Sequence, residues 1–303
     1  MAVESAKAAS SRRKSNAFPY WSVIPVLLFI ALFTLYPVYT AIKESFFLNI
    51  ITQPRNNPFI GLKNYTEVMT SYYFLSSLGT TSIYTLATVA GVILFGMVAA
   101  LVMNTSIMLS NFLKVIILLP WAVSTVVGGL LWKWILNSDF GIFSGILYSL
   151  GFIKEYIPFL SNPVLAKISL VVAHIWKEGP LAAIFILSGL QLIPKDLYES
   201  AGLDGGNKWS MFRLVTLPLL RPILLVVLVF ETVTSILSFD LVYVMTGGGP
   251  ADSTALISWF AYSEIFKSLN LGHGLALSII IAIITLALIS VYLRALKTDY
   301  TIH

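Results

Sequence analysis

The first residues of this sequence that could do chemistry are ionisable side chains inside apolar stretches. Lys177 and Glu178 interrupt segment 165–190, and Glu231 and Asp240 interrupt segment 222–244. Ionisable groups at membrane depth are costly, usually face protein or water, and mark functional sites. We therefore expect a polar cavity between the two segments. The candidates for its lining are Trp176, Lys177, Glu178, Glu231, Ser235, Asp240 and Tyr243.

A structural role is the alternative for each of these side chains. Lys177 and Glu178 are adjacent, so on a helix they point about 100° apart and each needs a partner of its own. A Lys–Glu pair, or a lysine bonded to backbone carbonyls, would tie two spans together or to a partner chain. For any single residue this structural role is the more common one.

Other chemistry is excluded by what the sequence lacks. It has no cysteine and therefore no thiol nucleophile, and its three histidines (His174, His273 and His303) show no metal-ligand spacing. We find no nucleophile, base and orienting group at mutual spacing. Gly247-Gly248-Gly249-Pro250 lacks the lysine of a phosphate-binding loop and is interpreted as a turn. We expect no catalytic residue, metal or cofactor in this chain, so any ATP chemistry must come from another chain.

The composition identifies the elements that must position these side chains. Of 303 residues, 57% are hydrophobic and 11% charged, with a mean hydropathy of +0.86, whereas soluble domains average about a quarter charged residues. The net charge of +5 is scattered along the chain, which does not indicate nucleic-acid binding. We predict an all-α membrane protein with six transmembrane helices. Their expected ranges are 20–42, 77–103, 112–136, 165–190, 222–244 and 271–296.

Basic residues in short loops predict the orientation. Lys and Arg collect before the first span, in loop 191–221 and after the last span, which favours cytoplasmic positions for both termini. The first apolar run is too long for a cleaved signal peptide, and no small-residue cleavage site follows it. We expect a cytoplasmic tail over residues 1–19 and one membrane domain over residues 20–303.

The longest inner polar interval, 191–221, is built like two short helices. Pro194 suits a first helical position, the chain continues as helix to Leu203, and Asp204-Gly205-Gly206 ends it. Asn207 can cap a second helix, before Pro218 and Pro222 mark the return to the membrane. An ordinary connector and a docking element for a partner are equally compatible with these residues.

This loop resembles the inner-loop signature of permease subunits of ATP-binding-cassette (ABC) importers, which reads E-A-A, two residues, D-G-A, then F and L-P. The residues of this sequence that align with the signature are Glu199, Ser200, Ala201, Gly202, Asp204, Gly205, Phe212 and Pro218. Ser200 and Gly206 replace two alanines of the pattern. Further stretches resemble the first permease of maltose or glycerol-3-phosphate type systems. They are 59–65, 119–121, 132–134, 175–177 and 246–250.

The resemblance implies a type I importer of the bacterial or archaeal plasma (inner) membrane that moves a sugar. Its expected partners are a second permease, two ATPase chains that bind ATP and Mg, an extracytoplasmic solute-binding protein, and membrane lipid. The loop helix would dock on an ATPase chain through Glu199, Ala201, Asp204 and Gly205. In the cavity, carboxylates would hydrogen-bond the hydroxyls of a sugar, and aromatic rings would pack on the apolar face of its ring.

Two alternatives remain open. A permease for glycerol-3-phosphate or a glycerol phosphodiester would need cavity cations, and Lys177 is the one basic residue deep in a predicted span. A proton-coupled secondary carrier would use Glu178, Glu231 and His174 as a relay, although the sequence shows no inverted repeat.

Overall fold

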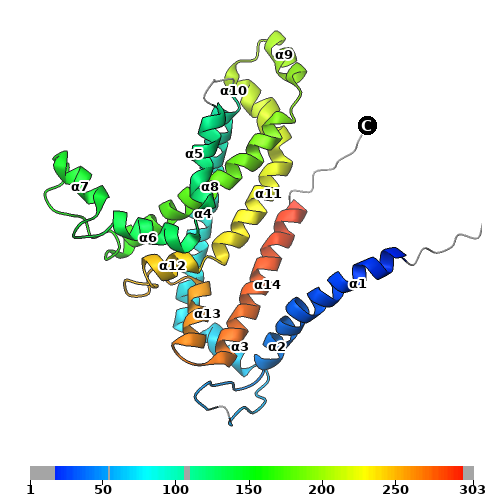
Figure 1. Cartoon of the computed structure of the whole chain (residues 1–303), viewed down its shortest axis with the longest axis vertical. Coiled ribbons are helices and arrows are strands. Elements are labelled where there is room, and N and C mark those ends of the chain that lie inside the picture. Colours follow the sequence, from blue (N-terminus) through cyan, green and yellow to red (C-terminus); the bar gives the residue numbers. More distant parts are fainter. Residues whose placement is uncertain (1–17, 54, 106–109, 296–303) are drawn as a thin grey trace, which may run out of the picture.

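The computed structural model describes residues 18–53, 55–105 and 110–295, and these form helices and no strands. Two isolated backbone bridges, Phe47 to Phe59 and Ile50 to Asn270, lie at one end of the molecule. Figure 1 shows α9 and α10 at one end of the bundle and α3 and α13 at the other. We name these the α9 end and the α13 end. The predicted all-helical fold is confirmed.

Five helical stretches are long and apolar enough to cross a membrane, or six if one bent pair counts as a span. The long helices are α4 (Tyr72–Met103), α8 (Pro163–Gln191), α11 (Leu217–Ile236), α14 (Leu271–Ala295), and α1 (Phe18–Ile30) continued by the π-helix η1 (Ala31–Leu35) and α2 (Tyr36–Glu44). The shorter helices are α3 (Lys63–Thr70), α5 (Ser110–Ala122), α6 (Thr125–Ile135), α7 (Ile142–Ser149), α9 (Lys195–Leu203), α10 (Lys208–Met211), η2 (Phe212–Thr216), α12 (Asp240–Met245) and α13 (Ile257–Phe266). Most of the predicted tail, residues 1–17, lies outside the described residues.

The third predicted span, 112–136, is a bent pair of helices and not one straight helix. Lys114–Ala122 and Thr125–Ile135 meet at 99°. Pro120 has no backbone N–H to continue the helix, and Ser124 is extended (φ −57°, ψ 140°). The bend places the start of α6 beside the middle of the bundle rather than at its end.

The fifth predicted span, 222–244, has the wrong bounds. One helical stretch runs from Lys208 to Ile236 and passes through both Pro218 and Pro222. The π-turn η2 directly precedes Leu217-Pro218 and relaxes the hydrogen-bond ladder where proline cannot donate. The second loop helix and the fifth span are therefore continuous, and the helix ends before Asp240.

Small residues bring α4 and α8 into close contact. A side chain at Gly96 would come within 3.1 Å of the backbone of Ala183, and one at Gly91 would overlap Ile175. Gly179 of α8 leaves the same kind of space for the Phe95 ring. The glycines of α4 and α8 therefore allow these two helices to pack closely.

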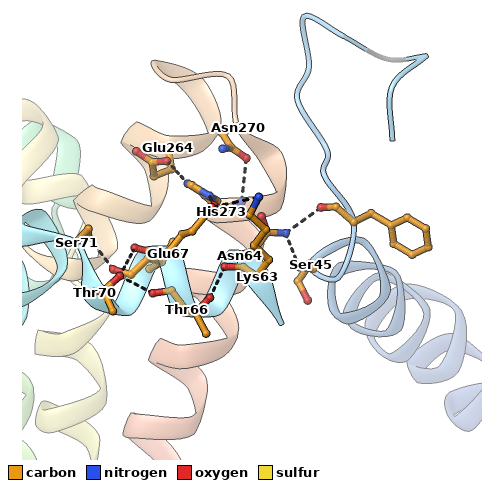
Figure 2. Close-up of polar contacts among 12 residues, drawn as sticks. Ser45, Lys63, Asn64, Thr66, Glu67, Thr70, Ser71, Glu264, Asn270 and His273 are labelled. Atoms are coloured by element: carbon orange, nitrogen blue, oxygen red, sulfur yellow. Dashed lines mark hydrogen bonds and ion pairs between the residues drawn. The ribbon is translucent and has the colours of Figure 1, made fainter. Parts of the chain in front are cut away.

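Polar contacts join the elements at the α13 end (Figure 2). The Asn64 amide on α3 donates to the carbonyls of Ser45 (2.7 Å) and Phe47 (2.9 Å). His273 on α14 lies between two carboxylates, with Nδ1 3.1 Å from Glu264 and Nε2 3.2 Å from Glu67. These contacts hold α3, α13, α14 and the segment after α2 in one arrangement.

Candidate functional site: an exposed helical turn and a polar cavity

The α9 loop contains the predicted helix and an exposed surface. Helix α9 ends at Leu203, as the sequence predicts, and begins at Lys195, one residue after the predicted first position at Pro194, which is the N-cap. None of its residues is buried. Leu203 is 91% exposed, and Glu199, Ser200, Gly202 and Asp204 are also exposed. An exposed leucine among small residues is a surface that a partner can cover.

The turn after α9 depends on its two glycines. Gly205 has φ +81°, a conformation that side-chain-bearing residues rarely adopt. The Gly206 N–H donates to the carbonyl of Ala201 at 2.9 Å, and a side chain at Gly206 would lie 2.6 Å from that oxygen. This turn therefore has its present shape because Gly206, and not the alanine of the pattern, stands here.

The loop is firmly attached to the bundle. The Asn207 side chain caps α10 by accepting the Ser210 N–H at 2.8 Å, and Trp209 stacks on Phe212 with ring centroids 5.7 Å apart. Phe212 packs on the core formed by α4, α8 and α11. Tyr198 of α9 lies 3.0 Å from the Thr216 hydroxyl, next to Leu217-Pro218. A force on α9 would therefore reach α11 directly.

A chain of buried hydrogen bonds links α4, α8 and α11 in the middle of the bundle. Tyr84 lies 2.8 Å from His174 Nδ1, and His174 Nε2 lies 2.6 Å from Glu231 Oε1. Ser235 donates to the same carboxylate oxygen at 3.0 Å, and Thr88 lies 2.8 Å from Ser235. We call these five residues the buried network. Because each has a polar partner, the network holds the three helices in register at low dielectric.

A polar cavity of about 220 Å³ lies beside this network, where the bend between α5 and α6 meets the end of α11. Its lining comprises Thr125, His174, Lys177, Glu178, Thr234, Leu237, Ser238, Phe239, Asp240 and Leu241. Ionisable side chains and hydroxyls surround one apolar ring, Phe239. Such a lining can hydrogen-bond a polyhydroxylated molecule and exclude a purely apolar one.

Lys177 is held by two groups. Its ammonium donates to the Trp121 carbonyl on α5 at 2.9 Å and lies 3.8 Å from the Glu178 carboxylate. The expectation that each member of the Lys177–Glu178 pair needs its own partner is therefore wrong in part, because the two side chains approach each other. The backbone contact agrees with the structural alternative for Lys177.

The structure brings some of the predicted cavity residues together and separates others. Lys177, Glu178 and Asp240 line the cavity, whereas Glu231 and Ser235 lie behind it in the buried network. The other two lie outside both sets: Trp176 packs edge-on against Trp132, and Tyr243 is 50% exposed on α12.

Sequence reasoning missed the contribution of α4 to this region. Tyr84 and Thr88, both on α4, complete the buried network, and no residue of the second predicted span was among the cavity candidates. The available signal was a stripe of polar residues at helical spacing in an apolar span. Its members are Ser77, Thr81, Tyr84, Thr85 and Thr88. In the described part of the chain, no three His, Asp or Glu residues group closely enough to hold a metal ion.

An exposed helix, α9, at one end of a membrane bundle and a polar cavity in its middle fit a permease subunit of an ABC importer. The chain belongs to the family described as "Binding-protein-dependent transport system inner membrane component", which matches residues 92–297. It is therefore a multi-pass membrane protein of a binding-protein-dependent import system.

Two relatives agree with this assignment, and a solved structure has the same fold. The chain is 34% identical to the sulfoquinovosyl glycerol transport system permease protein SmoG of Agrobacterium fabrum, covering 90% of this chain and 88% of that protein. It is also 34% identical to the trehalose/maltose transport system permease protein MalF of Thermococcus litoralis, covering 91% and 92%. A chain of a bacterial importer of the acidic polysaccharide alginate has the same fold, with a TM-score of 0.80 at 21% identity over 94% of this chain and 96% of that chain.

Proposed function

We propose that this chain forms half of the translocation pathway of an ATP-driven importer for a sugar or sugar derivative. Its partners in the proposal are a homologous second permease, two ATPase chains that bind ATP and Mg, and an extracytoplasmic solute-binding protein. The observation that carries the proposal is the exposed α9 turn, which is fastened to the helix that reaches the polar cavity.

In this proposal the α9 end faces the cytoplasm, both termini are cytoplasmic, and the membrane is the plasma (inner) membrane of a bacterium or archaeon. Support comes from the distribution of Lys and Arg, which collect at the α9 loop and beside both termini. The α13 end then faces outward, where a binding protein delivers the substrate.

Coupling in this proposal uses the continuous stretch from Lys208 to Ile236 as a lever. An ATPase chain grips α9 at Glu199, Ala201, Asp204 and Gly205, and closure of the ATPase pair on ATP moves it. Because Tyr198 and Phe212 fasten the loop to α11, the motion reaches Thr234 in the cavity wall. The cavity then changes the side to which it opens.

A sugar is the substrate class that the cavity and the relatives support together. Both 34% identical relatives carry names of transport systems for sugar-containing compounds. In the cavity, Glu178 and Asp240 can accept hydrogen bonds from hydroxyls, and Phe239 offers a ring face. A phosphate ester fits less well, because Lys177 already bonds Trp121 and lies beside Glu178.

The test is uptake of radiolabelled sugars by cells that express the chain with the chains that copurify with it. The panel contains trehalose, maltose and glycerol-3-phosphate. We expect uptake of a sugar that stops when ATP is depleted and persists when an uncoupler removes the proton gradient. Loss of uptake with the uncoupler alone would instead support the carrier that uses His174, Glu178 and Glu231. Preferential uptake of glycerol-3-phosphate would overturn the sugar assignment.

A further inference from the structure

A second polar cavity lies at the α13 end, outside the site described above. Its volume is about 380 Å³. It is formed by the start of α4, the segment after the Gly247-Gly248-Gly249-Pro250 turn, and α13. Four aromatic rings and several hydroxyls share its walls. The residues that matter most here are Tyr72, Tyr73, Ser76, Trp259, Phe260 and Ser263. We call this cavity the outer pocket.

The walls of the outer pocket are pre-arranged. Glu264 contributes one carboxylate oxygen to His273 at 3.1 Å, and the other accepts the Ser268 hydroxyl at 3.2 Å. Figure 2 shows Glu264 directed at His273, which also reaches α3. Tyr73 and Phe260 face each other across the α4 and α13 elements with ring centroids 6.2 Å apart. A ligand would therefore meet a wall that is already assembled.

The charges of the outer pocket disfavour anions. Asp252 and Glu264 line it, and the described cation beside it, Lys267, is not a lining residue but lies with Nζ 4.3 Å from the centroid of the Trp259 ring. An anionic ligand would be repelled by both carboxylates, whereas hydroxyl groups can donate to them. Exposed Tyr72 and Tyr73 supply apolar ring faces beside these acceptors. Hydroxyls around an apolar face are the chemistry of an uncharged sugar ring.

Two stacked aromatic rings, Trp259 and Phe239, separate the outer pocket from the polar cavity. Trp259 lines the outer pocket and stacks on Phe239, with centroids 6.0 Å apart and ring planes at 18°. Phe239 in turn lines the polar cavity. A side chain at Gly248 would overlap the Trp259 indole, so the glycine turn lets the backbone close over this ring.

We propose that the outer pocket is a second carbohydrate subsite, which holds one ring of an uncharged sugar before that sugar reaches the polar cavity. The inference rests on the proposed import of a sugar and adds a location and a charge preference to it. The rings of Trp259 and Phe239 form the boundary between the two subsites.

The absence of cysteine makes a protection experiment direct. Ser263→Cys places a single thiol in the outer pocket, and Ser138→Cys places one on an exposed loop away from it. Each variant is assembled with the chains that copurify with it, and its labelling by a membrane-impermeant maleimide is timed with and without the transported sugar of the panel. We expect the sugar to slow labelling of Ser263→Cys at least about fivefold and to leave the labelling rate of Ser138→Cys unchanged.

Equal labelling rates for Ser263→Cys with and without a sugar that is transported would overturn the outer subsite and leave the proposed function intact. If neither trehalose nor maltose is transported, the proposed import of these uncharged sugars fails and the outer subsite fails with it.

Aromatic substitutions provide a second measurement. Tyr73→Ala should raise the sugar concentration for half-maximal uptake by up to about tenfold, because an aromatic contact contributes roughly 0.5–1.5 kcal/mol. Tyr73→Phe should retain most of the affinity. Tyr148→Ala is the control, since Tyr148 is 54% exposed and Tyr73 is 58% exposed. If Tyr73→Ala abolishes uptake while the sugar gives no protection at Ser263→Cys, the pocket is a protein-docking surface and the subsite is rejected.

Discussion

The α9 turn and the buried network satisfy their polar groups in opposite ways. In the α9 turn, Glu199 and Asp204 are exposed, and no residue of the helix is buried. In the buried network, Glu231 is 1% exposed and is contacted by both His174 and Ser235. In the proposed function the exposed α9 surface is covered by a partner chain, whereas the polar groups of the network are satisfied within this chain. Substitutions in the α9 turn should affect coupling to the ATPase, and substitutions in the buried network should affect the stability of this chain.

Charge reversal in the α9 turn should have the largest effect on transport. Asp204→Arg and Glu199→Lys should each abolish uptake, because a reversed charge meets the partner surface in place of the carboxylate. Membrane insertion and thermal stability in detergent should be unchanged. Asp139→Arg, an exposed reversal on a different loop, is the matched control. Normal uptake by Asp204→Arg would remove the docking role.

Loss of the network carboxylate should mainly reduce stability. Glu231→Leu leaves His174 Nε2 buried without its acceptor at 2.6 Å, which costs about 2 kcal/mol. Thermal unfolding in detergent should move to a lower temperature, and the double variant with His174→Phe should recover part of the loss. Unchanged stability combined with lost uptake would instead assign Glu231 to transport.

Removal of the exposed cavity carboxylate should weaken sugar recognition. Asp240→Ala should raise the half-saturating sugar concentration about tenfold, since a hydrogen bond to a charged group contributes roughly 1.5–3 kcal/mol. Asp139→Ala serves as the control for an exposed aspartate elsewhere. Saturation curves of initial uptake rates provide the measurement. A change in maximal rate alone would place Asp240 in the coupling pathway.

Alanine substitutions at two glycines with similar backbone conformations can distinguish an effect of local strain on uptake from an effect on docking. Gly205 (φ +81°) and Gly151 (φ +76°) both have open space around them. Alanine in this conformation costs about 1 kcal/mol at either position. We expect Gly205→Ala to reduce uptake a few-fold and Gly151→Ala to leave it unchanged. Equal effects of the two variants would mean that strain alone explains the result.

Local signals predicted the elements of this fold well. Pro194, Asp204 and the following glycines bound α9 as expected, because capping and turn residues act within a few positions of themselves. The bend of 99° at Ser124 and the passage of α11 through Pro218 were missed. Both depend on how neighbouring helices support an interrupted hydrogen-bond ladder, and that support is not visible in one segment of sequence.

The candidate site was predicted only in part, because some of its residues come together only through the packing of distant helices. Charge inside apolar segments identified Lys177, Glu178 and Asp240, which line the polar cavity. Tyr84 and Thr88 carry no charge, and only the packing of α4 on α8 and α11 shows that they complete the network. The outer pocket combines residues more than 150 positions apart, such as Tyr73 and Phe260, which no local pattern connects.

The most direct measurement is copurification from cells that express a tagged form of this chain, wild type beside Asp204→Arg and Asp139→Arg. Mass spectrometry of the mild-detergent extracts identifies the chains recovered with each. The account predicts a second permease and an ATPase with the wild type and with Asp139→Arg, and loss of the ATPase with Asp204→Arg. Recovery of the wild-type chain alone, stable and active in transport after reconstitution, would contradict it.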